Sequence, residues 1–183
     1  MSTSSDGDGR KKLPKRLRRL QEIRPRDEDG NIVFFVTICV LHRHRVLANE
    51  AFFSGLCSFL HESDRRYGWQ PTRFVVMPDH LHHIVYAGEP TCELGDWAKA
   101  LKRTAHRLGN HVGIPVKKSW QWQESEHDHV FRSVKSEGDK WVYMCFNPVR
   151  AGLVEFPEQW EYGGEIFYDT DPPTLVRGVP AVR

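Results

Sequence analysis

The sequence predicts a single α+β domain in which helices pack on an antiparallel sheet. Strand-like and helix-like segments alternate along the chain, the strand-like segments are short, and some of the gaps between them have hairpin length. Short strands with such gaps favour an antiparallel sheet over a doubly wound parallel one. The 183 residues are 39% hydrophobic. A chain of this length can bury one good core, and about one domain is expected.

The first two elements are a strand and a helix. Residues 31–41 are β-branched and aromatic and follow Asp29-Gly30, a pattern typical of a buried strand after a turn. A helix is then expected from residue 50 to about residue 66, because its apolar residues recur at spacings of three and four and form one stripe. Asn49 can cap the start of this helix, and Gly68 ends it.

Two short apolar runs, residues 72–77 and 81–87, lie on either side of Pro78-Asp79. They predict two adjacent strands or one strand interrupted by a bend. In either case we expect them in the middle of the sheet.

A second helix is expected from residue 93 to about residue 108, with Gly109-Asn110 as its end. Apolar side chains line one face of this helix, and that face belongs to the core. The basic residues on the rest of its surface are Lys99, Lys102, Arg103, His106 and Arg107. This basic side is either a solvated face or a surface that follows a phosphate backbone.

Two further elements complete the domain. Residues 119–124 alternate like a strand with one solvent-facing side. A third helix is expected to begin near Ser136, with Asp139 three residues on in a capping-box arrangement. It must end at about Asn147, because Pro148 disfavours helical geometry in the residue before it.

The chain divides into three parts. Residues 1–28 form a basic arm, in which six of the ten residues 11–20 are Lys or Arg. Such a run is usually a solvated or flexible arm, and phosphate contact is compatible with it. Residues 29–168 form the single domain, and residues 169–183 are expected to form a Pro-rich, irregular tail.

Composition limits the class of protein. The formal net charge is only +2, so no overall field argues for nucleic acid. The four cysteines are scattered without a C-x-x-C pair, which indicates small core residues in a reducing cytosol. No apolar stretch approaches the roughly 18 residues that a membrane span requires, so we expect a cytoplasmic protein without a membrane partner.

The candidate chemistry lies among the histidines. Of three His-x-His triplets, only His80-Leu81-His82 begins an apolar run, whereas His42-Arg43-His44 lies in a basic turn and His127-Asp128-His129 in an acidic polar segment. On a strand, residues two apart point to the same face about 6–7 Å apart, so two imidazoles could converge on one cation. The alternative is that the pair only donates hydrogen bonds.

Tyr143 and Asn147 are four residues apart in the third helix and therefore neighbours on one helical face. A tyrosine in a helix is ordinarily half-buried packing, and an asparagine at a helix end is ordinarily a cap. The residue types alone leave both the structural and the chemical interpretation open.

Two ordered blocks of sequence carry a resemblance. The first is Val76-Met77-Pro78-Asp79-His80-Leu81-His82, and the second runs from Tyr143 through Asn147-Pro148-Val149-Arg150-Ala151-Gly152 to Val154. Together they resemble the single-tyrosine HUH transposases, and most closely the REP-associated tyrosine transposases. Further matches are Phe35-Val36-Thr37, Lys102, Trp122-Gln123, Asp128-His129 and Arg132, so the resemblance runs from about residue 31 to residue 164. Asp79 departs from the pattern, because the family usually has Asn there.

The resemblance implies a ferredoxin-like (RRM-like) HUH fold and a metal-dependent endonuclease and strand transferase. Tyr143 would attack a phosphodiester of single-stranded DNA, leaving a 5′-phosphotyrosine and a 3′-hydroxyl. His80 and His82 would hold a divalent metal, Mg²⁺ or Mn²⁺, with Asn147 as a third ligand. A phenol with a pKa of about 10 is a poor nucleophile at neutral pH, so a cation must polarise the phosphate.

The implied partner is single-stranded DNA with hairpin (REP-like) elements, bound by a monomer or homodimer in the cytoplasm at the nucleoid. Besides the basic arm, the candidate DNA contacts are Lys102, Arg103, His129, Arg132 and Arg150. Trp120 or Trp122 could stack on unpaired bases, although a tryptophan in a strand is more often core.

Two other classes of function stay open. A domesticated protein could bind DNA hairpins without cleaving them, although its expected mark, a broken tyrosine or histidine, is absent. A zinc-dependent hydrolase or structural zinc protein could use His80, His82, His127 and His129. Catalytic zinc normally keeps three protein ligands, and no His-Glu-x-x-His helix is present.

Overall fold

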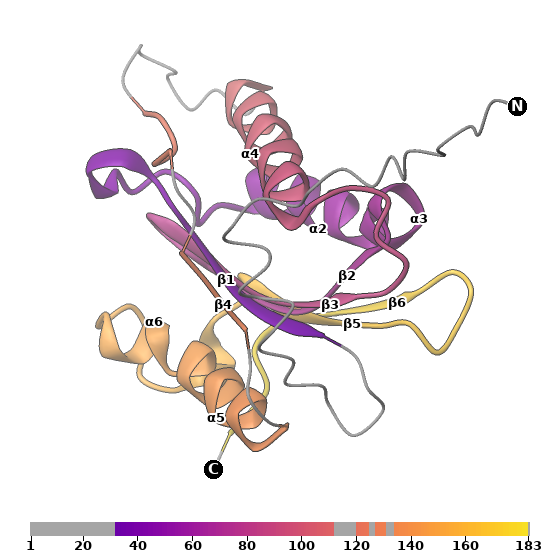
Figure 1. The fold of residues 1–183 in the computed structure, drawn as a ribbon. Helices are drawn as coiled ribbons and strands as arrows, with labels where there is room; N and C mark the ends of the chain where they lie inside the picture. The colour runs from indigo at the N-terminus through magenta and orange to yellow at the C-terminus, as the bar shows by residue number, and fades with distance from the viewer. Residues whose placement is uncertain (1–31, 112–119, 125–126, 131–133, 183) are drawn as a thin grey trace, which may run out of the picture.

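The computed structural model describes residues 32–111, 120–124, 127–130 and 134–182. Its helices are α2 (Glu50–His61), α3 (Ser63–Tyr67), α4 (Leu94–His111), α5 (Val134–Cys145) and α6 (Asn147–Arg150), with 3-10 turns η1 (Leu41–Arg43) and η2 (Pro157–Gln159). A sheet lies between two helical layers: α2, α3 and α4 cover one face, and α5 and α6 cover the other (Figure 1). The predicted α+β class is therefore confirmed.

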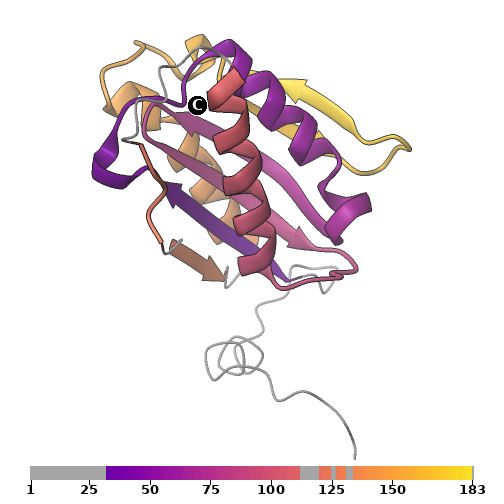
Figure 2. The same cartoon turned by 90° about the horizontal axis from the view of Figure 1, so that it is seen from above.

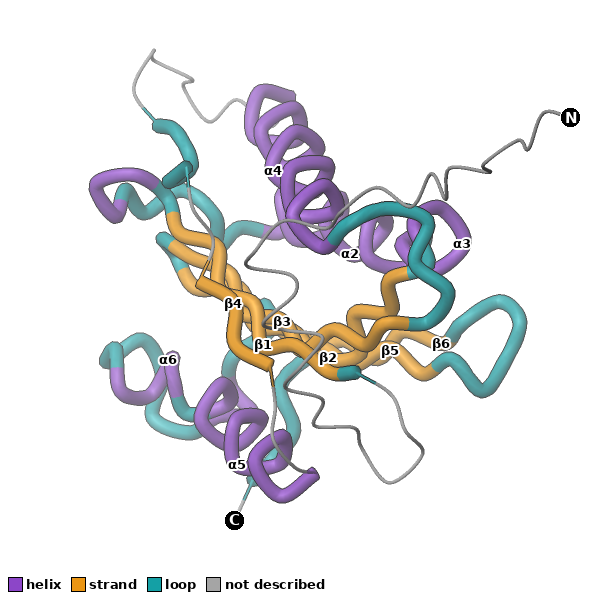
Figure 3. The backbone as a smooth tube through the Cα atoms, viewed as in Figure 1, coloured by secondary structure: helices purple, strands orange, loops and turns teal. Residues whose placement is uncertain are grey.

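The sheet has six strands in the order β4-β1-β3-β2-β5-β6, and all neighbours are antiparallel. The strands are β1 (Val33–Cys39), β2 (Trp69–Met77), β3 (His80–Ala87), β4 (His127–Val130), β5 (Gly163–Phe167) and β6 (Thr174–Arg177). They form one continuous layer (Figure 3). The two runs beside Pro78-Asp79 occupy its middle as β2 and β3, which confirms the prediction.

β2 and β3 form a tight hairpin whose turn is Pro78-Asp79, so these runs are two adjacent strands. His80 is the first residue of β3 and pairs with Met77 across the hairpin. On its other side β3 pairs with β1, which sets Cys39 opposite His80 and Thr37 opposite His82. Backbone ladders on both sides therefore hold the His-x-His triplet in place.

The helix predicted over residues 50–66 is two helices, α2 and α3, separated at Glu62. Asn49 caps α2 as predicted, because its side-chain oxygen accepts from the backbone N–H of Phe52 at 3.0 Å. Gly68 ends α3 with a left-handed φ of 68°. A Cβ at Gly68 would overlap the backbone of Glu89, so the position requires glycine.

α4 crosses the sheet beside α2 (Figure 2) and buries its apolar stripe as predicted. The predicted end at Gly109-Asn110 is wrong, since the helix continues to His111. A glycine costs a helix interior about 1 kcal/mol and does not have to stop it. Among the described residues, no helix combines the length and the apolar character needed to span a bilayer.

The predictions for residues 119–124 and for the start of the third helix need correction. Residues 120–124 form no strand, and only Trp122 makes an isolated bridge, to Val40. The reason is that β1 turns away into η1 directly after Val40. α5 begins at Val134, so Ser136 lies inside the helix and is not its cap.

The helix end at Asn147 is correct to within two residues, because α5 stops at Cys145. Pro148 then occupies the first turn of α6, where proline is tolerated. The tail after Thr170 is not irregular throughout: Thr174–Arg177 form β6, an edge strand on β5. Pro172 and Pro173 precede the strand and Pro180 follows it, so none of them costs a ladder hydrogen bond.

Two apolar cores flank the sheet, one under α2 and α4 and one under α5. Alternation along β3 assigns its side chains to these cores. Leu81 and Val85 lie in the first core and Ile84 lies in the second. His80 and His82 therefore point to the α5 face, and His83 points to the α4 face.

Candidate active site

His80 and His82 face each other on the α5 side of β3. Their ring centroids are 4.6 Å apart, and their Nε2 atoms are 3.0 Å apart. His82 is buried against Phe35, whose ring stacks on it at 5.2 Å. The convergence predicted for a His-x-His pair on a strand is confirmed.

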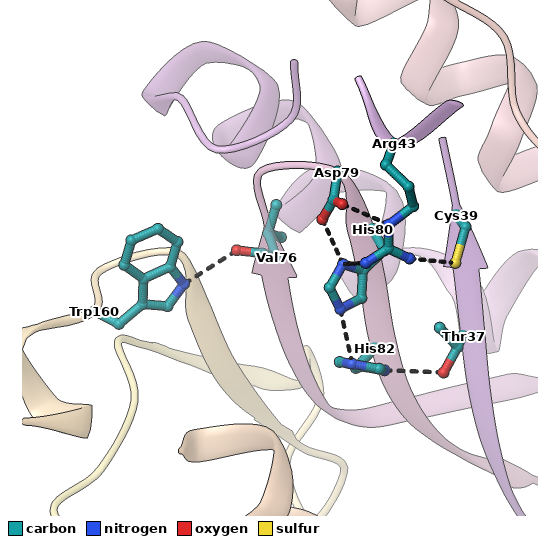
Figure 4. A network of polar contacts seen from close by, with 8 residues as sticks. All are labelled: Thr37, Cys39, Arg43, Val76, Asp79, His80, His82 and Trp160. Atoms are coloured by element: carbon teal, nitrogen blue, oxygen red, sulfur yellow. Dashed lines mark hydrogen bonds and ion pairs between the residues drawn. The ribbon is translucent and has the colours of Figure 1, made fainter. Parts of the chain in front are cut away.

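Both imidazoles are held through their Nδ1 atoms (Figure 4). His80 Nδ1 lies 2.6 Å from Asp79 Oδ1, and His82 Nδ1 lies 2.9 Å from Thr37 Oγ1. Arg43 Nη2, which can only donate, also lies 3.2 Å from His80 Nδ1. The carboxylate contact is the shorter one and a carboxylate only accepts, so we assign the proton to Nδ1, which leaves a lone pair on Nε2. The Thr37 hydroxyl can donate or accept, so His82 can carry its proton on either nitrogen.

Asp79 is itself held by Arg43 from the turn η1. Arg43 Nε pairs with Asp79 Oδ2 at 2.6 Å, and Arg43 Nη1 donates to Cys39 Sγ at 3.3 Å (Figure 4). His42 and Arg43 both have a left-handed φ of 56°. For residues other than glycine this conformation costs about 1–3 kcal/mol and persists only where the surroundings enforce it, commonly at functional sites.

Burial keeps the histidine pair neutral. Loss of solvent lowers the pKa of His80, against the opposing effect of the Asp79 carboxylate. Burial, followed by the proximity of His80, holds the pKa of His82 well below its usual value of 6.5. Neutral imidazoles are the form that binds a metal ion.

His83 lies on the opposite face and is not part of this site. It is fully buried between Phe74 and Trp97, and neither ring nitrogen has a hydrogen-bond partner. Burial lowers its pKa to about 3. Because side chains alternate along a strand, this third histidine points away from the pair.

Tyr143 on α5 reaches the histidine pair. Its ring centroid lies 6.1 Å from that of His82, and 43% of the residue is exposed. Two cations flank the ring, with Lys140 Nζ at 5.2 Å and the Arg150 guanidinium at 4.3 Å from its centroid. A solvent-accessible phenol, two imidazoles and two cations thus meet on one face of the sheet.

A polar network fixes α5 on the sheet. Glu137, in the first turn of α5, is only 6% exposed. It accepts from Tyr86 Oη at 2.7 Å and from Arg73 Nη1 at 3.1 Å. Arg73 also donates to Glu165 at 3.0 Å. Because these partners lie on β3, β2 and β5, the tyrosine helix is anchored on the sheet of its own chain.

Asn147 lies at the start of α6, beside Arg150. Its Oδ1 accepts from Arg150 Nη2 at 2.9 Å, and the same Nη2 donates to the backbone oxygen of Tyr143. Its Nδ2 is buried without a partner. Arg150 therefore links Asn147 to the tyrosine, while the described contacts of Asn147 do not include the histidine pair.

The donor set fits an open divalent-metal site. Two ligands at right angles, each about 2.1 Å from an ion, are about 3.0 Å apart, which matches the separation of the two Nε2 atoms. Two nitrogen lone pairs at this distance repel each other unless a cation or a proton lies between them. Among the described residues, no group of three or more His, Cys, Asp or Glu is arranged so that it could hold a metal ion, so other ligands would complete the site.

The remaining predicted residues are dispersed. Lys102 and Arg103 lie on α4, across the sheet from Tyr143. His127 and His129 are in β4, where their backbones pair with Thr37 and Phe35. Arg132 lies outside the described residues, as does the basic arm.

Sequence reasoning missed the groups that support the pair. Thr37 was part of a matched block without an assigned role, and Arg43 was noted only as part of a basic turn. Lys140 carries a signal that could have found it, because it precedes Tyr143 by three residues and shares its helix face.

A His-x-His pair on a central strand, faced by a tyrosine on a helix across the sheet surface, is the arrangement implied by the resemblance to single-tyrosine HUH transposases. No family model matches the chain. A curated protein of Haemophilus influenzae, "Putative REP-associated tyrosine transposase", is 21% identical over 145 residues, which are 75% of this chain and 81% of that protein.

One solved structure gives the same likeness in fold. A REP-associated tyrosine transposase bound to a REP hairpin matches with a TM-score of 0.57 and 21% identity, over 72% of this chain and 75% of that one. A "putative transposase" from Deinococcus radiodurans has a TM-score of 0.47 and 23% identity, over 62% of this chain and 88% of that one. The chain is thus similar to REP-associated tyrosine transposases, and the first of these structures confirms the fold that the resemblance implied.

Proposed function

We propose that this protein cleaves and rejoins single-stranded DNA beside hairpin elements, with Tyr143 as nucleophile. The observation that carries the proposal is the placement of an exposed tyrosine ring 6.1 Å from His82, on the face where His80 and His82 direct their Nε2 atoms. The partner is inferred from the similar solved structure, which is bound to a REP hairpin.

The proposed reaction conserves the energy of the broken bond. The Tyr143 oxygen forms a bond to phosphorus, and the bond from phosphorus to the 3′ oxygen breaks. The phenol loses its proton to solvent and the leaving oxygen gains one, so the products are a 5′-phosphotyrosine and a free 3′-hydroxyl. Because phosphorus exchanges one ester for another, attack by a 3′-hydroxyl reverses the step and joins strands without ATP.

His80 and His82 would hold a divalent cation, Mg²⁺ or Mn²⁺, with Asn147 as a candidate third ligand through Oδ1. Such an ion, when bound, polarises the scissile phosphate and stabilises the leaving oxygen. Asp79 and Thr37 keep the two rings aligned from behind, as outer partners of metal-binding histidines do.

Lys140 and Arg150 give the tyrosine a positive surrounding. Both lie over its ring, so they attract the phosphodiester that Tyr143 must attack. Arg150 also fixes the backbone of Tyr143 and the amide of Asn147. Glu137 anchors α5 on the sheet of its own chain, which supports a site whose nucleophile and histidine pair come from one subunit.

Adduct formation tests the proposal. The protein is incubated with labelled single-stranded DNA hairpins and Mn²⁺, and the products are separated on a denaturing gel. A covalent adduct is expected with the wild type, and it is expected to disappear in Tyr143→Phe and in His80→Ala. Tyr67→Phe, which changes a tyrosine on α3, is the matched control and should keep the adduct.

An adduct that survives Tyr143→Phe would refute the assignment of the nucleophile. Hairpin binding without an adduct on any hairpin would instead favour a domesticated DNA-binding protein.

A further inference from the structure

A second concave site lies on the α4 side of the sheet. It is a pocket of about 650 Å³ between α4 and residues 120–124, which we call the α4 pocket. Of the residues that the structure describes, those lining it are Lys102, Arg103, His106, Arg107, Gln121 and Trp122. Its volume falls in the range of about 300–1,000 Å³ that is usual for ligand sites. The cleavage chemistry proposed above uses none of these residues.

Hydrogen bonds fix the walls of the α4 pocket against each other. Trp122 Nε1 donates to the backbone oxygen of Lys102 at 3.1 Å, and Lys102 Nζ donates to the backbone oxygen of Gln123 at 2.9 Å. Trp122 also packs edge-on against the buried ring of Trp120, which in turn lies 5.1 Å from the ring of His106. The aromatic wall is therefore held in place before any ligand binds.

The rim of the pocket is positively charged. Arg103 and Arg107 are exposed, and neither forms an ion pair with any acidic residue that the structure describes. Residues 120–124 contribute a single acid, Glu124. A ligand that combines an aromatic ring with negative charge matches this mixture of tryptophan, imidazole and guanidinium groups.

Residues 121–123 also run beside the end of β1 that faces the histidine pair. Gln123 N donates to Cys39 O at 2.9 Å, and Leu41 N donates to Gln121 O at 2.6 Å. Cys39 is the residue paired with His80 across the ladder. The α4 pocket and the candidate active site therefore lie at the same end of the sheet, on its two faces.

We propose that the α4 pocket binds an unpaired nucleotide of the DNA strand, with its base against Trp122 and its phosphates near Arg103 and Arg107. This inference rests on the proposed function, because it takes the ligand to be DNA. Only an unstacked base can enter a concave aromatic site, so the pocket selects single-stranded DNA over a duplex.

Two DNA probes test this assignment by fluorescence anisotropy. One is a hairpin with a single-stranded flank, and the other is the same hairpin with blunt ends. The double variant Arg103→Ala/Arg107→Ala should weaken binding of the flanked hairpin about tenfold and leave the blunt hairpin unchanged. Trp122→Leu should cause a similar loss, and Trp122→Phe should restore most of it, because stacking on a base needs only an aromatic face.

Arg66→Ala is the matched control, since Arg66 is an exposed arginine on α3 on the same side of the sheet. Circular dichroism melting identifies any variant that has lost its fold, and the arginine variants carry the test if Trp122→Leu is unstable. Equal losses of affinity for both hairpins, or no loss of affinity for either, would overturn the assignment. The assignment would also be overturned if free deoxynucleotides competed for the protein as well as the unlabelled flanked hairpin does.

Adduct formation at Tyr143 separates this inference from the proposed function. If the wild type forms an adduct and the pocket variants bind the flanked hairpin normally, the pocket assignment is refuted and the cleavage proposal stands. If the pocket variants lose affinity only for the flanked hairpin and no adduct forms, the pocket assignment is supported and the cleavage proposal is refuted.

Discussion

Replacing Asp79 perturbs the proposed metal site at its best-defined contact. Asp79 Oδ1 accepts from His80 Nδ1 at 2.6 Å, and Arg43 holds the second oxygen at 2.6 Å. Asp79→Ala removes the group that fixes the orientation and tautomer of His80. Asp79→Asn restores the residue usual in the resembling family and keeps one oxygen that can accept from Nδ1.

The expected effect follows from how outer partners act on metal ligands. Loss of such a partner typically weakens metal binding about 10–100-fold, which corresponds to about 1.4–2.8 kcal/mol. The Arg43 side chain is 52% exposed, so its ion pair with Asp79 contributes only about 0–1 kcal/mol and most of the effect must come through His80. We therefore expect a loss near 100-fold for Asp79→Ala and near tenfold for Asp79→Asn.

The assay is calorimetric titration of the full chain with Mn²⁺ at fixed pH, which needs no DNA and no turnover. Asp96→Ala is the control, because Asp96 is an exposed carboxylate on α4 that pairs with Lys99. If Asp79→Ala bound Mn²⁺ as tightly as the wild type, the proposed support of His80 would be refuted.

Four further predictions concern ionisation and stability. Mn²⁺ affinity, measured by calorimetry from pH 8 to 5, should stay constant until the pH is below 6.5 and then fall. The reason is that the pKa values of His80 and His82 are lowered, so both ligands stay neutral. A fall in affinity that begins above pH 7 would contradict this. His83 has a folded pKa of about 3 against an unfolded value of 6.5, so it contributes stability that is complete above pH 6.5 and is lost as the pH falls toward 3. His83→Phe removes this titration, so it should flatten the acid dependence of the free energy of unfolding in urea titrations; an unchanged pH slope would count against this. The same variant should raise the free energy of unfolding by about 1–3 kcal/mol at pH 7, because both ring nitrogens of His83 are buried without hydrogen-bond partners. Glu137→Ala should cost about 1–3 kcal/mol and slow adduct formation, with partial rescue by Gln, which can still accept from Tyr86; a destabilised variant with wild-type adduct rates would show that the anchor does not position Tyr143. Asn49→Ala should cost about 0.5–2 kcal/mol in the same titrations, without any change in Mn²⁺ affinity.

Local signals in the sequence were sufficient for the elements that carry the histidines. The apolar runs beside Pro78-Asp79 predicted either two adjacent strands or one bent strand, and on a strand the period of two sets His80 and His82 on one face. Asn49 was identifiable as a cap from its residue type and position. The failures arose where tertiary context overrides propensity: Gly109 sits inside α4, and β6 forms because the exposed edge of β5 offers a ladder to Thr174–Arg177.

The support of the site could not be predicted in the same way. Asp79 was visible as a carboxylate next to His80, but Arg43 reaches it from 36 positions earlier through a left-handed turn that no local pattern indicates. The anchor of Glu137 joins α5 to three strands, so it depends on the complete sheet order. Contacts of this kind are set by topology, which single-residue patterns do not encode.

The most direct test of the central claim is peptide mapping of the covalent DNA adduct by mass spectrometry. After reaction with a hairpin substrate and Mn²⁺, followed by nuclease and protease digestion, a nucleotide phosphate is expected on the peptide that contains Tyr143, linked through its phenolic oxygen. A phosphate linkage on any other residue, or a wild-type protein that binds Mn²⁺ and the hairpin yet yields no linked peptide, would contradict the account.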